Sequence, residues 1–187
     1  MVDLERTRDL FMVAAIFGTF GFAWAGWAQE APPPRLRPLL GALGAASLLV
    51  GVAGGLLAWQ GWDEPSSFSG ADDGVRFGIV VGIEVVLCLV GSAVLAARRR
   101  AGLIAAWVSL VVGVHFVPLV FLFDNLTLLA PAAAMVVSAV VAWRRAPAAG
   151  SPDGGGSMAA SAVTGLVNAP VLLLTAALNL VLGLTAS

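Results

Sequence analysis

The sequence has few residues that could build a cross-linked or metal-bound framework. It contains one cysteine, one histidine and no tyrosine in 187 residues, and every basic residue is an arginine. A single cysteine, Cys88, excludes a disulfide framework and cysteine-based zinc or iron–sulfur sites. With one histidine, tight zinc or haem coordination is not expected, so we predict neither a metal nor a cofactor. The absence of lysine and tyrosine beside abundant alanine, glycine, valine and leucine fits the coding bias of a high-GC bacterium.

Charge is also scarce. Only 11% of the residues are charged and 59% are apolar, with a mean hydropathy of +0.95. A soluble domain has about 25% charged and roughly 45–50% apolar residues, so its surface could not be covered with this composition. The net charge of −1 supplies no basic field, which excludes a nucleic-acid partner. The composition therefore predicts an integral membrane protein whose main partner is the lipid bilayer.

Long apolar runs define the predicted elements. About 20 apolar residues are needed to cross a hydrocarbon core of roughly 30 Å, and a single segment in lipid must be helical to satisfy its own backbone. The sequence predicts an all-α polytopic bundle of six transmembrane helices, forming one integral membrane domain over residues 1–187 with a linker over 146–157. The predicted helices are 10–28, 39–60, 77–97, 102–123, 126–143 and 159–184.

The arginines predict the orientation of the bundle. Short loops rich in arginine stay in the cytoplasm, which places the loops at 35–37, 98–100 and 144–145 on that side of the plasma (inner) membrane. Both termini are then non-cytoplasmic. A signal peptide cleaved after Ala28 is the alternative for the first segment, but its long apolar stretch and acidic start favour a retained helix.

Small residues predict where the helices approach one another. Gly78 and Gly82, and the stripe of Ser47, Gly51 and Gly55, recur at four-residue spacing. Such spacing lets helix backbones pack closely in lipid. We expect both stripes to lie at helix interfaces.

Two ionisable residues fall inside apolar segments. Such groups cost about 2.5–3.5 kcal/mol each at the centre of a membrane helix and tend to face the bundle interior. Glu84 and His115 each lie about 12 Å from the outer end of their helix, at 1.5 Å per residue. Because the two helices are antiparallel neighbours, we expect the side chains to meet. Glu84 also shares a helical stripe with Cys88 and Gly91, which suits an inward face.

Further polar residues are predicted near the outer boundary. Asp124 is a second candidate acid at the rim of the pocket, although Asp at such a position is also typical of a turn or cap. Trp62, Asn125 and Asn179 are predicted to line the outer part of the pocket and to contact an apolar small-molecule substrate.

A purely structural interpretation of the Glu84 and His115 pair stays open. A neutral carboxyl that bonds to His115 or to a backbone carbonyl is an interhelical clasp without any chemistry. An intramembrane ionisable residue is a functional candidate by default, and the site interpretation is preferred for that reason.

The run Val112–Leu119 carries a resemblance. It reads Val-Gly-Val-His-Phe-Val-Pro-Leu and resembles a His-Phe-x-Pro-Leu signature of small polytopic bacterial membrane proteins. It is also similar to the membrane-embedded terpene cyclases of bacterial indole-sesquiterpenoid pathways, which have comparable size and hydropathy. The resemblance covers one helix, and the rest of the chain matches in hydropathy only.

The resemblance implies an enzyme that cyclises an isoprenoid chain after protonating it, without a metal. Glu84 or Asp124 would be the acid, His115 would orient it or accept the final proton, and aromatic walls would stabilise the carbocation. The alternative is a small proton-coupled transporter or a non-enzymatic accessory membrane protein, in which Glu84 and His115 form a proton relay. Six helices leave little room for a wide translocation path, so the transporter interpretation predicts a homodimer.

Overall fold

The protein is an all-helical bundle. The computed structural model describes residues 6–30, 32–67, 70–146 and 158–186, and within them six helices are long and apolar enough to cross a membrane. The predicted fold class is confirmed. The long helices are α1 (Thr7–Ala28), α2 (Arg37–Gln60), α3 (Ala71–Ala97), α4 (Ile104–Phe123), α5 (Leu129–Arg145) and α6 (Ala160–Ala186), and short 3-10 turns form η1 (Pro34–Leu36), η2 (Ala101–Leu103) and η3 (Leu126–Leu128).

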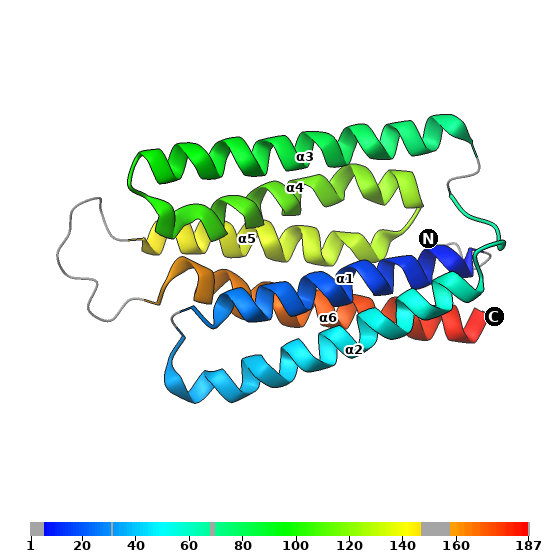
Figure 1. Ribbon diagram of the computed structural model, residues 1–187, viewed down its shortest axis with the longest axis horizontal. Helices are drawn as coiled ribbons and strands as arrows, with labels where there is room; N and C mark the ends of the chain where they lie inside the picture. The colour runs from blue at the N-terminus through cyan, green and yellow to red at the C-terminus, as the bar shows by residue number, and fades with distance from the viewer. Residues whose placement is uncertain (1–5, 31, 68–69, 147–157, 187) are drawn as a thin grey trace.

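The helices form two groups of three. Helix α1 packs most extensively against α2 and α6, while α4 packs against α5 and α3, and contacts between α5 and α6 join the two groups (Figure 1). Helix α3 lies at the edge and packs mainly along α4. The start of α1 and the end of α6 lie at the same end of the bundle, as an even number of crossings requires.

Several helix boundaries differ from the predicted ones. Helix α3 begins at Ala71, before the apolar run that starts at Phe77, because Gly70 and Asp73 cap an extra turn: the Asp73 carboxylate accepts a hydrogen bond from the Gly70 N–H at 3.2 Å. Acidic residues are favourable in a first helical turn. Helix α5 begins at Leu129 because η3 precedes it. Of the predicted linker 146–157, all but Ala146 lies outside the described residues.

The tight turn between α4 and α5 depends on two polar residues. Asp124 ends α4 in the left-handed conformation, with a φ of 46°, which Asp adopts more readily than most residues. The side chain of Asn125 then accepts a hydrogen bond from the Thr127 N–H at 3.0 Å and caps η3. The interpretation of Asp124 as a turn and cap residue is confirmed.

One of the two small-residue stripes forms a helix interface. Gly18 of α1 lies against the backbone of Gly51 of α2, and Gly54 lies against Phe11 and Ala15. Side chains at these positions would collide with backbone atoms, so the prediction for the α2 stripe holds with Gly54 in place of Gly55.

The prediction for Gly78 and Gly82 is wrong within this chain. A side-chain carbon at either position would meet nothing within 4 Å. Both glycines face away from α4, because α3 presents the opposite face, with Glu84, Cys88 and Gly91, to the bundle. Gly91 lies directly against the ring of Trp107, whose indole N–H donates to the Leu87 carbonyl at 2.9 Å.

A buried hydrogen-bond network joins α4, α5 and α6. The Asn168 amide donates to Ser109 Oγ at 2.9 Å, and Ser138 Oγ donates to Asn168 Oδ1 at 2.9 Å. All three side chains are almost fully buried. Hydrogen bonds of this kind hold helices together where water is absent, so we assign the network to stability.

Candidate functional site

A cavity of about 560 Å³ lies between α1, α3 and α4. Ligand pockets typically measure about 300–1,000 Å³. Most lining residues recur three or four positions apart, so each helix contributes one face, and most are apolar. The lining comprises Arg8, Asp9, Met12, Val13, Ile16, Phe17 and Phe20 from α1, Phe77, Val81 and Glu84 from α3, Val112, His115, Phe116, Leu119 and Phe123 from α4, with Trp62, Ser66 and Leu128 from connecting segments.

Glu84 and His115 meet in the wall of this cavity. The distance between Glu84 Oε2 and His115 Nε2 is 3.3 Å, and the side chains are 17% and 7% exposed. The predicted contact is confirmed. His115 Nδ1 is buried and has no hydrogen-bond partner among the described residues. A buried polar atom without a hydrogen-bond partner is uncommon in folded proteins.

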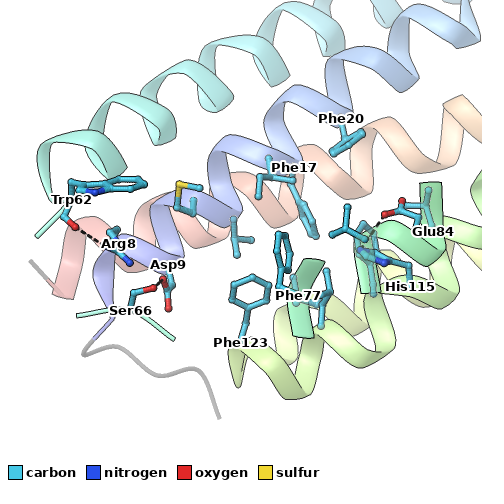
Figure 2. Close-up of a pocket in the computed structure, with 18 residues that line it drawn as sticks. Arg8, Asp9, Phe17, Phe20, Trp62, Ser66, Phe77, Glu84, His115 and Phe123 are labelled. Atoms are coloured by element: carbon cyan, nitrogen blue, oxygen red, sulfur yellow. Dashed lines mark hydrogen bonds and ion pairs between the residues drawn. The ribbon is translucent and has the colours of Figure 1, made fainter. Parts of the chain in front are cut away.

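Aromatic rings occupy the middle of the cavity. Phe17 and Phe116 lie with their ring centroids 4.9 Å apart, and Phe77 meets Phe123 edge-on at 6.0 Å. Figure 2 shows Phe17, Phe77 and Phe123 between the two labelled polar ends of the cavity. Aromatic faces carry partial negative charge, so they attract a cation without supplying a nucleophile.

A second polar group lies at the other end of the cavity, where the loop before α3 meets the start of α1 (Figure 2). The Asp9 carboxylate is 8% exposed and accepts hydrogen bonds from Ser66 Oγ at 2.7 Å and from the Ser67 N–H at 2.6 Å. Arg8 donates to the Trp62 carbonyl, and its guanidinium lies 5.1 Å from the centre of the Trp62 ring. The loop is thereby fastened to α1.

The predicted site residues do not form one cluster. Glu84, His115 and Trp62 line the cavity, whereas Asp124, Asn125 and Asn179 are not among its lining residues. Asp124 is exposed at the end of α4. Asn125 Nδ2 donates to Asn179 Oδ1 at 2.9 Å, and Asn179 Nδ2 donates to Thr127 Oγ1 at 3.0 Å. These amides hold η3 against α6. Trp62, by contrast, lines the cavity and contacts Arg8 there.

Arg8, Asp9 and Ser66 line the cavity but were absent from the predicted site. A signal was present, since Asp9, Val13 and Phe17 follow one another at four-residue spacing and so share a helix face. No pattern in the sequence links Ser66 to Asp9, because 57 residues separate them along the chain.

Among the residues that the structure describes, no three His, Cys, Asp or Glu side chains gather as metal ligands would. Comparison with protein-family models, with curated proteins and with solved structures found no match for this chain. The fold and the site therefore define only a class of protein: the six apolar helices fit a multi-pass integral membrane protein with a cavity lined largely by apolar and aromatic side chains.

Proposed function

We propose that the protein is a membrane-embedded cyclase that protonates an isoprenoid chain held in the cavity. The observation that carries this proposal is that an aromatic cavity contains a carboxyl and an imidazole in contact with each other, at Glu84 and His115. Such a reaction needs an acid shielded from water and walls that stabilise a carbocation. The resemblance of the Val112–Leu119 run to membrane terpene cyclases points in the same direction.

The chemistry would run through Glu84. Its carboxylic acid transfers a proton to a terminal carbon–carbon double bond, and the resulting cation is attacked by the next double bond, which closes a ring. A proton then leaves the carbon beside the new cation for His115 and returns to Glu84. The product is an isomer of the substrate, so no oxidant or second substrate is consumed.

The aromatic rings would act on the cation during this sequence. Phe17, Phe77 and Phe116 line the cavity, where positive charge would develop as the ring closes. A cation over an aromatic face gains about 0.5–2 kcal/mol per contact. The apolar lining would also keep water from quenching the cation to an alcohol.

The test uses the purified full-length chain in lipid nanodiscs with farnesol and geranylgeraniol, in H₂O and in D₂O. We expect a cyclic isomer that gains one deuterium in D₂O, detected by mass spectrometry, and no product from Glu84→Gln. The matched control is Asp124→Asn, which changes an exposed acid outside the cavity and tolerates the left-handed backbone. It should retain full turnover.

One result would overturn Glu84 as the acid, and another would contradict the cyclase itself. Loss of product in Asp124→Asn with retention in Glu84→Gln would place the acid at the rim. Absence of product together with uptake of the alcohols into vesicles driven by a proton gradient would identify the transporter alternative. Normal folding of Glu84→Gln, checked by its thermal transition, separates lost chemistry from a broken clasp.

A further inference from the structure

The cavity is elongated and polar at both ends. Figure 2 shows Arg8, Asp9, Ser66 and Trp62 at one end and Glu84 and His115 at the other, with aromatic rings between them. The two ends differ in chemistry. Glu84 and His115 bond to each other, whereas the other end holds a guanidinium and a carboxylate that do not pair.

The charge of Asp9 is already satisfied within the protein. Its two oxygens accept hydrogen bonds from Ser66 Oγ and from the backbone N–H of Ser67. The Ser67 hydroxyl in turn accepts from the Arg6 guanidinium at 2.8 Å. Asp9 is therefore part of the fastening between α1 and the loop rather than a partner for a ligand.

Among the residues that the structure describes, no acid pairs with the guanidinium of Arg8. Among the described residues its guanidinium contacts Trp62 alone, through the carbonyl and the ring face. A guanidinium carries five N–H donors, and the Trp62 carbonyl takes one of them. Arg8 is half-buried and lines the cavity, so a planar, charged donor with spare hydrogen-bonding capacity is held at its mouth. This chemistry suits bidentate recognition of a phosphate or carboxylate.

The length of the cavity sets the length of the ligand. Arg8 and Phe20 are twelve residues apart on α1, which corresponds to roughly 18 Å at 1.5 Å per residue. An extended carbon chain advances about 1.25 Å per atom from ordinary single-bond geometry, so about twelve carbons and a head group span this distance. Phe20 and Glu84 lie at the same end of the cavity in Figure 2, so the tail of such a chain would finish beside the acid.

We propose that the cavity takes a single-chain amphiphile with an anionic head, in which Arg8 binds the head and the chain runs past the phenylalanines to Glu84 and His115. Trp62 packs on the guanidinium and keeps it aimed at the cavity. The tail of the chain would meet Glu84 and His115, the pair that the proposed cyclase uses. This ligand class therefore rests on the proposed function, and it specifies that the tail of the substrate is the end that reacts.

The experiment measures binding rather than turnover. The full-length chain in uncharged phosphatidylcholine nanodiscs is titrated with radiolabelled farnesyl phosphate, with farnesol, geranyl phosphate and inorganic phosphate as competitors. We expect Arg8→Gln to raise the Kd for farnesyl phosphate by about tenfold or more, the usual effect of losing a hydrogen bond to a charged group, and to leave farnesol binding within about twofold. The Kd of Arg8→Lys for farnesyl phosphate should lie between those of the unchanged protein and Arg8→Gln, because lysine keeps the positive charge but lacks the planar pair of donors of a guanidinium.

The matched control is Arg76→Gln, which removes an exposed arginine that does not line the cavity, near the start of α3 at the same end of the bundle. It should bind all ligands as the unchanged protein does. Equal losses in Arg76→Gln and Arg8→Gln would reduce the effect to general surface charge and overturn the head site. Equal losses of affinity for farnesol and farnesyl phosphate in Arg8→Gln would show that Arg8 has a structural role only. Competition by inorganic phosphate as strong as by farnesyl phosphate would show that the hydrocarbon chain of the ligand contributes nothing to binding, which would overturn the amphiphile.

The two proposals fail separately. If farnesyl phosphate binding depends on Arg8 while no cyclic product forms from any probe, the cyclase is wrong and the amphiphile site stands. If product forms and Arg8→Gln changes neither binding nor turnover, the cyclase stands and the head site is wrong.

Discussion

Asp9 and Glu84 are two carboxyls in the same cavity with different surroundings. Asp9 accepts two hydrogen bonds from the loop that covers one end, and it is buried. The Glu84 carboxyl contacts the imidazole of His115, and the wall of the cavity around this pair is otherwise apolar. A carboxylate whose oxygens both accept hydrogen bonds from the protein stabilises the fold. A carboxyl beside an imidazole in an apolar wall can exchange a proton with a ligand.

Replacement of Asp9 tests this difference in stability. Asp9→Ala removes the acceptor of the Ser66 hydroxyl and the Ser67 N–H, and leaving a buried donor unsatisfied costs about 1–3 kcal/mol. We expect a lower thermal transition in detergent for Asp9→Ala and an unchanged one for Asp63→Ala, which alters an exposed acid in the same loop. Equal transitions for both variants would mean that the loop is not fastened through Asp9.

At the scale of the elements, the cavity depends on two helices that are held differently. Helix α1 is clamped against α2 and α6, and its glycine contacts with α2 leave no room for adjustment. Helix α3 packs mainly along α4, where Trp107 donates to the Leu87 carbonyl. One wall of the cavity is thus rigid, and the other belongs to the most exposed of the six helices.

The clamp on α1 is open to a direct test. In Gly18→Ala, the added methyl group would overlap the backbone of Gly51 and push α1 away from α2. Overpacking of this kind typically costs about 1–3 kcal/mol. We expect a lowered thermal transition and weaker ligand binding, because Phe17 moves with the helix. Gly82→Ala adds the same group where nothing lies within 4 Å, and a comparable loss in that variant would show that α3 is packed on this face as well.

At the scale of the whole molecule, the bundle has two distinct ends. The arginine-rich turn at 98–100 is at one end, and the start of α1, the end of α6 and the Asp9 loop are at the other (Figure 1). The mouth of the cavity lies at the end that the arginine distribution predicts to be non-cytoplasmic. A substrate made in the cytoplasm would then have to be carried across the bilayer before it reached this mouth.

Reporter fusions test the predicted orientation. Alkaline phosphatase is active only outside the cytoplasm, so we expect activity for a fusion at the C-terminus and none for a fusion in the 98–100 turn. Green fluorescent protein at the same two sites should give the opposite pattern. If phosphatase is active at 98–100 instead, the bundle is inverted and the cavity opens toward the cytoplasm.

The contact between Glu84 and His115 could be predicted because depth along a helix is a count of residues, and two helices joined by a short turn must be antiparallel neighbours. Trp62 was placed near the site for a similar reason, since it follows a helix end. For Asn125 and Asn179 the predicted depth near the end of the bundle was correct, but the predicted place in the lining of the cavity was wrong. The depth of a residue does not determine the direction in which its side chain points around the helix axis. The expectation for Gly78 and Gly82 failed for the same reason.

The sequence by itself determined the class, the six helices, their approximate bounds and the depth of each polar residue, because these follow from local hydropathy and from the constant rise of a helix. Only the tertiary structure decided which faces of α1, α3 and α4 line a cavity, that the loop at 61–67 is fastened to Asp9, and that Arg8 contacts Trp62 rather than an acid within the described part of the chain. Lipid and helix interior are equally apolar, so hydropathy does not distinguish a lipid-facing side chain from a packed one. That choice is made by the fit of side chains between helices far apart in sequence.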